Sequence, residues 1–181
     1  MHLNCRCRLR PVLGDLGGRL HWVDTNLIGP EWVGKLGENQ VDAMLSTTAL
    51  HWLAPESLTR LYRELGELVH PGGIFLNGDN LKFGPHLPSF LRIAQTTKER
   101  TRVDSFDRCC LEDWESWWKA LRAESALREL FAERDRRFSW KAAGGQAPIF
   151  DLHVAALRDS GFREVGVIWQ NMENRLLMAV R

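Results

Sequence analysis

Residues 41–53 read VDAMLSTTALHWL, and residues 68–79 read LVHPGGIFLNGD. Each stretch holds a short, nearly continuous apolar run, VDAMLS at 41–46 and IFLN at 74–77, followed by small polar residues. Such runs are typical of parallel strands that are buried on both faces. We therefore predict two neighbouring strands that run in the same direction and end at the same edge of a sheet.

The chain between these strands predicts an amphipathic helix. Its apolar residues fall three or four positions apart, on one stripe: Leu58, Leu61, Tyr62, Leu65, Leu68 and Val69. Pro55 and Glu56 suit the first turn, where proline is tolerated and the glutamate opposes the positive end of the helix dipole. We expect His70-Pro71-Gly72-Gly73 to stop the helix, with a glycine at positive φ.

The end of the chain predicts a helix and a hairpin. Apolar residues at helical spacing mark a helix over 149–157, which Ser160-Gly161 ends. FREVGVIW (162–169) alternates as a strand, and RLLMAVR (175–181) follows after a five-residue turn. Strands joined by so short a turn are antiparallel. The predicted fold class is therefore α/β, with a mostly parallel sheet and an antiparallel C-terminal strand.

Three further segments complete the pattern. LHWVD (20–24) predicts a short strand and PEWVGKL (30–36) a short helix that begins with its proline. Residues 81–147 are too long for a plain crossover, and we interpret them as a helical insertion or lid. Its aromatic residues include Trp114, Trp117 and Trp118 at helical spacing. These rings either line an apolar substrate pocket or pack as an ordinary core.

Composition limits the class of protein. The chain has 181 residues, which favours a single domain over 1–181, and a net charge of +1. That balance argues against nucleic-acid binding through a basic surface. No apolar run reaches the roughly 18 residues of a membrane span, and the N-terminus has no apolar signal region, so we expect a cytoplasmic protein. Cys5, Cys7, Cys109 and Cys110 lack metal-ligand spacing, so we expect free thiols and no metal.

Four segments resemble the class I S-adenosylmethionine-dependent methyltransferases of the small-molecule type. VDAMLSTTALHWL is similar to the family's D-x-x-x-S … L-H-W segment, and LVHPGGIFLNGD to its L-x-P-G-G turn and fifth strand. WVDTNLIGPEWVGKL (22–36) resembles the third strand and its loop. ALRDSGFREVGVIW (156–169) and NRLLMAVR (174–181) resemble the last helix, the sixth strand and the antiparallel seventh. The likeness covers roughly residues 13–80 and 148–181.

The family's first strands and Gly-rich loop have no counterpart in this sequence. The early glycines in LGDLGGRL (13–20) do not follow a strand-like segment. The resemblance thus implies a Rossmann-like methyltransferase sheet that lacks its N-terminal part, a truncated form of the domain. Without those strands, 41–46 becomes an edge, which either LHWVD covers or a second copy of the chain covers by self-association.

The resemblance also implies a cofactor, S-adenosylmethionine, and a set of contact residues. These are Asp24, Asn26 and Leu27 after the third strand, and Ser46, Thr47, Leu50 and His51 after the fourth. Asn26 stands near the position of an acid and can accept the same hydrogen bond without charge. The alternatives are a solvated turn at 24–26, a simple turn opening at 46–48, and packing of His51 and Trp52 against the sheet.

Methyl transfer asks little of the protein beyond positioning, because the cofactor is already activated. A general base is needed only for a poorly acidic nucleophile. His51 and His86 are candidate bases from position alone, although His86, in GPHLP, also fits an exposed loop. The sequence assigns neither the acceptor nor its acceptor atom.

Two functions follow. The first is S-adenosylmethionine-dependent methyl transfer to a small-molecule acceptor, impaired if the missing N-terminal motif is essential. The second is a non-catalytic remnant or interaction module of the same fold, which would bind no cofactor and would self-associate through its open sheet edge.

Overall fold

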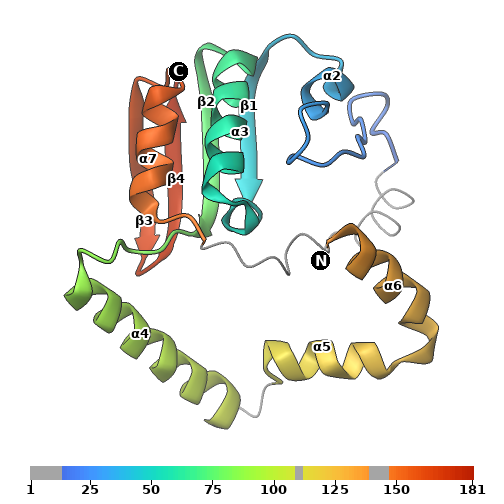
Figure 1. Ribbon diagram of the computed structural model, residues 1–181, viewed down its shortest axis with the longest axis vertical. Coiled ribbons are helices and arrows are strands. Elements are labelled where there is room, and N and C mark those ends of the chain that lie inside the picture. Colours follow the sequence, from blue (N-terminus) through green and yellow to red (C-terminus); the bar gives the residue numbers. More distant parts are fainter. Residues whose placement is uncertain (1–13, 109–111, 139–146) are drawn as a thin grey trace. The chain divides into compact units, whose positions relative to one another are not determined.

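A four-stranded sheet organises the computed structural model, which describes residues 14–108, 112–138 and 147–181. Its strands are β1 (Val41–Thr47), β2 (Val69–Asn80), β3 (Glu164–Asn171) and β4 (Asn174–Val180). They lie in the order β1-β2-β4-β3 (Figure 1). The chain's last strand therefore lies inside the sheet, between β2 and β3.

The strand directions confirm the predicted fold class. β1 and β2 are parallel, with Met44 opposite Phe75 and Leu45 opposite Leu76. β4 runs antiparallel to β2 on one side and to β3 on the other. Because β4 is the one reversed strand, β1, β2 and β3 share a direction, and their carboxyl ends meet at one edge.

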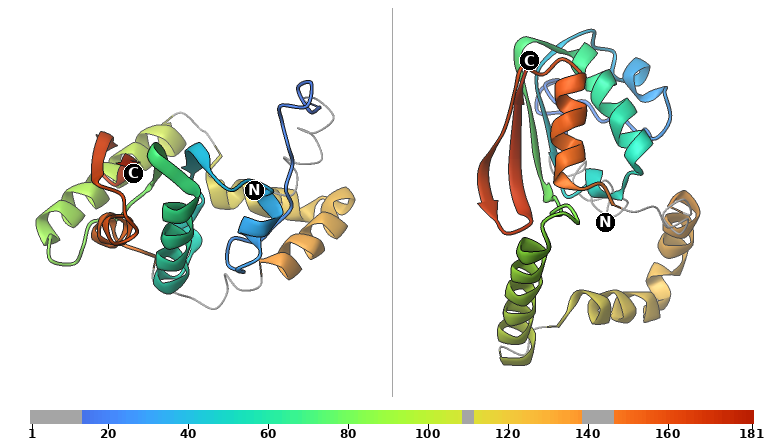
Figure 2. Two further views of the ribbon diagram at one scale, coloured as in Figure 1. Left: turned by 90° about the horizontal axis from the view of Figure 1, so that it is seen from above. Right: turned by 60° about the vertical axis from the view of Figure 1, so that its left-hand side comes forward.

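Helices α3 (Pro55–Leu68) and α7 (Phe150–Asp159) pack side by side on the same face of this sheet (Figure 2). The predicted apolar stripe of α3 is buried there. Gly66 permits the close approach, because a Cβ at this position would lie 2.1 Å from the Ser160 carbonyl oxygen. The core between helices and sheet consists mainly of Leu58, Leu61, Tyr62, Leu65, Phe75, Leu157, Phe162, Leu177 and Ala179.

The opposite face of the sheet carries exposed apolar side chains. Leu45 on β1 is 74% exposed, and Ile168 and Trp169 on β3 are exposed as well. The prediction that 41–46 is buried on both faces is therefore wrong. The run is as apolar as a buried strand of an α/β sheet. However, β1 pairs only with β2 within the described residues, so it is an edge strand there and part of its apolar surface stays exposed.

Three predicted boundaries also change. Residues 20–24 form no strand and do not pair with β1, so this apolar pentapeptide gains no ladder hydrogen bonds. The helix expected at 30–36 is α2 (Trp32–Leu36), which begins two residues after its proline. α3 passes directly into β2, so Pro71-Gly72-Gly73 lies inside that strand, with Gly72 at φ +87° as expected for a glycine.

The predicted insertion is helical in its described parts. It contains α4 (Pro88–Arg102), a π-helical turn (Val103–Arg108), α5 (Trp114–Ala123), a 3₁₀ turn (Ser125–Leu127) and α6 (Arg128–Arg137). Asp113 caps α5 by accepting a hydrogen bond from the Ser116 amide at 2.8 Å. Whether this segment acts as a lid stays a prediction.

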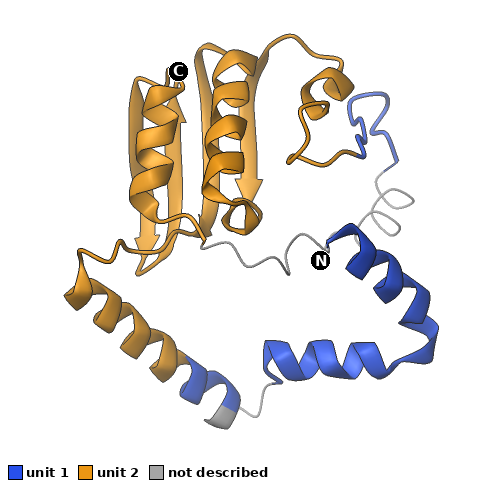
Figure 3. Cartoon of the chain, viewed as in Figure 1, with its two compact units in different colours: residues 1–24, 102–144 blue, residues 25–101, 145–181 orange. Residues whose placement is uncertain are grey.

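The chain divides into two compact units (Figure 3). One comprises residues 1–24 and 102–144, and the other, the sheet unit, comprises 25–101 and 145–181. In the first unit Trp114 stacks on Trp117, and Trp118 meets Phe131 edge-on. Trp114 is 57% exposed and Trp117 40%, so these rings contact one another but form no buried core, and a substrate-pocket role stays a prediction.

Two expectations concern the environment of the chain. None of the described helices is long and apolar enough to cross a bilayer. The four cysteines lie outside the described residues, at 5, 7, 109 and 110. In the part of the chain that the structure describes, no three His, Cys, Asp or Glu side chains gather as metal ligands would.

Candidate functional site

The carboxyl edge of the sheet brings together the ends of β1 and β2. Ser46 and Thr47 close β1, and the chain then turns through Thr48, at φ +48°, into a 3₁₀ turn (Leu50–Trp52). Asp79, near the end of β2, fixes this turn. Its carboxylate accepts hydrogen bonds from the amides of Leu50 at 3.1 Å and His51 at 3.2 Å.

The same carboxylate holds the His51 ring. Asp79 Oδ1 lies 2.6 Å from His51 Nδ1, and it also accepts the Asn80 amide at 2.8 Å. Because the carboxylate can only accept, Nδ1 carries the proton and Nε2 of the neutral ring keeps a lone pair. The Asp79 side chain is fully buried, whereas that of His51 is 26% exposed. A buried carboxylate thus orients a partly exposed imidazole, and the role of His51 as a base stays a prediction.

Electrostatics keeps Asp79 ionised. Burial by itself raises the pKa of this carboxyl, but the hydrogen bond from His51 and the backbone amides outweigh burial and lower the pKa below its ordinary value. A carboxylate that stays charged is a steady partner for an imidazole that gains a proton.

A second polar pair lies in the core beneath this edge. The Tyr62 hydroxyl on α3 is 2.6 Å from His153 Nδ1 on α7, and both side chains are fully buried. Burial lowers the pKa of His153 to about 4, so its ring is neutral at pH 7. Burial, and then the charge of Asp79, raises the pKa of Tyr62. This pair therefore joins the two helices as neutral partners.

The structure places the predicted site residues in three groups. Ser46, Thr47, Leu50 and His51 come together at the carboxyl edge, with Leu50 buried. Asn26 accepts the Ile28 amide at 3.0 Å in a local turn, and Leu27 packs against the core. Asn26 and Leu27 therefore have structural contacts close to them in the chain or in the core.

Asp24 and His86 are the two other predicted residues. Asp24 belongs to the other compact unit, where its carboxylate is 3.5 Å from Arg137. His86 is exposed in the loop before α4, with Nε2 3.4 Å from Asp151. The alternative interpretation of His86, an exposed loop histidine, agrees with this position.

Sequence reasoning missed several polar residues of the sheet unit. Asn77 and Arg175 are buried, although each lies in an otherwise apolar strand. Tyr62 and His153 lie at core positions of their helices, where the pattern predicted only packing. The available signal was a polar residue at a core position, which needs a partner when buried.

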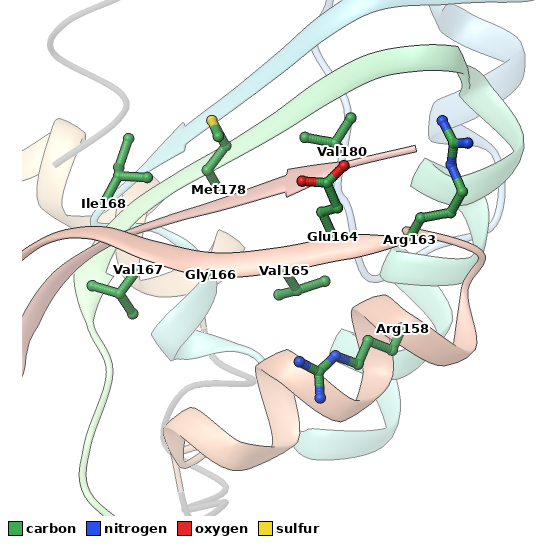
Figure 4. A pocket seen from close by; sticks show the side chains of 9 residues that line it. All are labelled: Arg158, Arg163, Glu164, Val165, Gly166, Val167, Ile168, Met178 and Val180. Carbon is green, nitrogen blue, oxygen red and sulfur yellow. The ribbon is translucent and has the colours of Figure 1, made fainter.

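A shallow depression of about 360 Å³ runs along β3 (Figure 4). Its lining residues are Arg158, Arg163, Glu164, Val165, Gly166, Val167, Ile168, Met178 and Val180. It contains none of the predicted site residues, and the carboxyl edge therefore carries the better candidate site.

Comparison with known proteins gives structural matches alone. The sequence matches no family model and no curated protein. An O-methyltransferase family protein from Burkholderia thailandensis aligns with 97% of this chain at 17% identity and a TM-score of 0.55. PigF, solved with SAH, aligns with 99% at 17% identity and 0.51, and the S-adenosylmethionine-dependent methyltransferase SibL with 99% at 15% identity and 0.51.

This chain covers 40% of the first of these structures, 41% of the second and 40% of the third. It thus spans about two fifths of their length, and nearly all of it takes part in the match. At these identities the likeness concerns the fold. Together with the strand order and the single reversed strand, it shows that this chain has the fold of the class I S-adenosylmethionine-dependent methyltransferases.

Proposed function

We propose that the carboxyl edge of β1 and β2 serves methyl transfer from S-adenosylmethionine to a small-molecule hydroxyl. The observation that carries the proposal is the His51–Asp79 pair. It combines a buried, ionised carboxylate with a partly exposed imidazole at the edge where open α/β sheets bind ligands.

The residues at this edge fit one flank of the cofactor. The hydroxyls of Ser46 and Thr47 have no hydrogen-bond partner among the described residues and are available to a ligand. The His51 ring contacts Trp52 at a centroid distance of 4.7 Å and offers a flat surface beside them. Of the other predicted contacts, Asn26 and Leu27 also belong to the sheet unit, whereas Asp24 belongs to the other unit.

The cofactor, when bound, supplies a methyl group on a positively charged sulfur. With the cofactor bound, His51 Nε2 would accept the proton of the acceptor hydroxyl, whose oxygen replaces the cofactor's sulfur on the methyl carbon, so that the sulfur leaves as a neutral thioether. Asp79 holds the ring through Nδ1 and stabilises the imidazolium that results, as the aspartate does in a Ser-His-Asp triad. The proton leaves to water after the product departs.

Binding of labelled S-adenosylmethionine by the 181-residue chain tests the proposal. We expect Ser46→Val to weaken binding about five- to tenfold, the effect of one hydrogen bond of roughly 1 kcal/mol. Ser160→Ala is the matched control, because it removes a hydroxyl that bonds to Ala156 O within α7, away from the edge. Absence of saturable binding to the wild-type chain would refute the proposal.

One observation favours the second candidate, an interaction module. The outer side of β1 has no partner strand among the described residues, and its Leu45 is largely exposed. Two copies of β1 can pair antiparallel about Met44. That register sets Asp42 opposite Ser46 of the second copy and Ala43 opposite Leu45, with no like charges facing.

Light scattering separates the two candidates. An interaction module predicts a dimer mass for the wild-type chain and a monomer mass for Leu45→Arg, which puts like charges near the two-fold axis. Leu130→Arg is the control, since Leu130 is an exposed leucine of α6. A monomeric wild-type chain that binds S-adenosylmethionine would reject the second candidate.

A further inference from the structure

Arg175, the second residue of β4, is a buried cation without a counter-ion. Its side chain is only 3% exposed, and its Nε and Nη1 atoms are buried with no hydrogen-bond partner. A guanidinium stays charged at any ordinary pH, even though burial lowers the pKa of Arg175. Buried charges are ordinarily paired, because water is no longer there to solvate them.

The nearby carboxylates are engaged elsewhere. Asp79, directly opposite Arg175 on β2, binds His51. Glu173 accepts the Phe83 amide at 3.2 Å, and Asp151 lies beside His86. None of the described carboxylates forms an ion pair with Arg175. The charges of Glu173 and Asp151 act on the guanidinium only through space, raising its pKa against the effect of burial, and its Nε and Nη1 donors keep no acceptor among the described residues.

Two aromatic rings restrict how a partner can approach. The guanidinium carbon lies 4.3 Å from the centre of the Phe83 ring and 4.2 Å from that of Phe150. The N–H bonds of a guanidinium point outward in its plane, so a partner forms hydrogen bonds at the edge of the group. A flat carboxylate, coplanar with the guanidinium, matches this edge with two parallel hydrogen bonds better than a tetrahedral phosphate.

The position of Arg175 connects it to the candidate site. Since β4 is antiparallel to β2, its first residues lie at the same carboxyl edge as Asp79. We propose that Arg175 binds a carboxylate of the acceptor, and so selects acceptors that carry a carboxylate in addition to the hydroxyl. The acceptor role rests on the proposed methyl transfer, whereas carboxylate binding by Arg175 is independent of the cofactor.

Benzoate is a suitable probe, since it is a small planar carboxylate, and benzamide is its neutral counterpart. In calorimetric titrations of the 181-residue chain without cofactor, we expect benzoate to bind at least about tenfold more tightly than benzamide or inorganic phosphate. Arg175→Met should weaken benzoate binding at least about tenfold. Methionine fills the slot between the rings and leaves no unpaired charge, so this variant should remain folded.

Arg158→Met is the matched control, because Arg158 is an exposed arginine in the last turn of α7, at the other end of the helix from Phe150. A second readout uses the wild-type chain labelled with ¹⁵N-arginine. The Arg175 Nε–H signal, identified by its loss in Arg175→Met, should shift on addition of benzoate and stay fixed with benzamide.

Equal binding of benzoate and benzamide, tighter binding of phosphate, or unchanged benzoate binding by Arg175→Met would each overturn the inference. Failure here leaves the binding of labelled S-adenosylmethionine untouched, and failure of that binding leaves the benzoate result untouched. The two proposals therefore stand or fall on separate measurements.

Discussion

Replacing Asp79 by alanine should destabilise the sheet unit and release the turn that carries His51. The carboxylate accepts four hydrogen bonds, from the amides of Leu50, His51 and Asn80 and from the His51 ring. Alanine leaves the buried Leu50 amide without an acceptor, at a cost of about 1–3 kcal/mol. Loss of the charge-assisted bond to the ring adds about 1–2 kcal/mol, for a total of about 2–5 kcal/mol.

Urea unfolding at pH 7 measures this loss, with Asp159→Ala as the control. Asp159 is exposed and lies 3.8 Å from the exposed Arg63, so its removal should change stability by less than about 0.5 kcal/mol. Amide hydrogen exchange gives a local readout, in which the amides of Leu50 and His51 should lose protection. Equal effects of the two substitutions would refute the assignment of Asp79 as the anchor of this turn.

The pH dependence of the effect has a defined sign. The folded-state pKa of Asp79 lies below its ordinary value of 3.8. Its stabilising contribution is therefore complete above that value and is lost as the pH falls through the folded-state pKa. The stability difference between wild type and Asp79→Ala should shrink in this acidic range, and a difference that stays constant down to pH 2 would contradict the proposed ionised state.

Three further substitutions test other contacts within the two units. His153, with its pKa lowered from 6.5 to about 4, is neutral when folded, so stability should fall by up to about 3 kcal/mol between pH 6.5 and 4, and urea titrations of His153→Leu should lack this loss. Gly66→Ala should lower the free energy of unfolding by about 1–3 kcal/mol, because the new Cβ would meet the Ser160 carbonyl oxygen. The control Gly34→Ala, in α2, places its Cβ in open space and should be neutral or stabilising, so equal melting temperatures of the two variants would contradict the Gly66 contact. Asp113→Ala removes the cap of α5 and should lower its helicity, with a stability loss of about 1 kcal/mol measured by circular dichroism; an unchanged spectrum and melting curve would exclude a capping role.

The sequence by itself determined the elements of the sheet unit and their order. Leu58, Leu61 and Leu65 recur three and four residues apart, and this spacing predicts the helix that the structure shows as α3. The short turn predicted at 170–174 required an antiparallel pair, and the sheet has it, although the turn itself shortens to Met172 and Glu173 between β3 and β4. The position of His51, in the turn that follows β1, was also enough to place it at the carboxyl edge. All of these predictions rest on the spacing of apolar residues and on the length of a turn, and both are properties of a short stretch of sequence.

Tertiary structure alone decided which residues meet. The His51–Asp79 and Tyr62–His153 pairs join positions 28 and 91 residues apart, and no local pattern encodes such distances. Burial also depends on neighbours: VDAMLS is apolar enough for a central strand, yet β1 lies at an edge because LHWVD does not pair with it. Arg175 is an ordinary charged residue in the sequence, and only the rings of Phe83 and Phe150 closing over it make it a buried cation, since desolvation is a property of the folded surroundings.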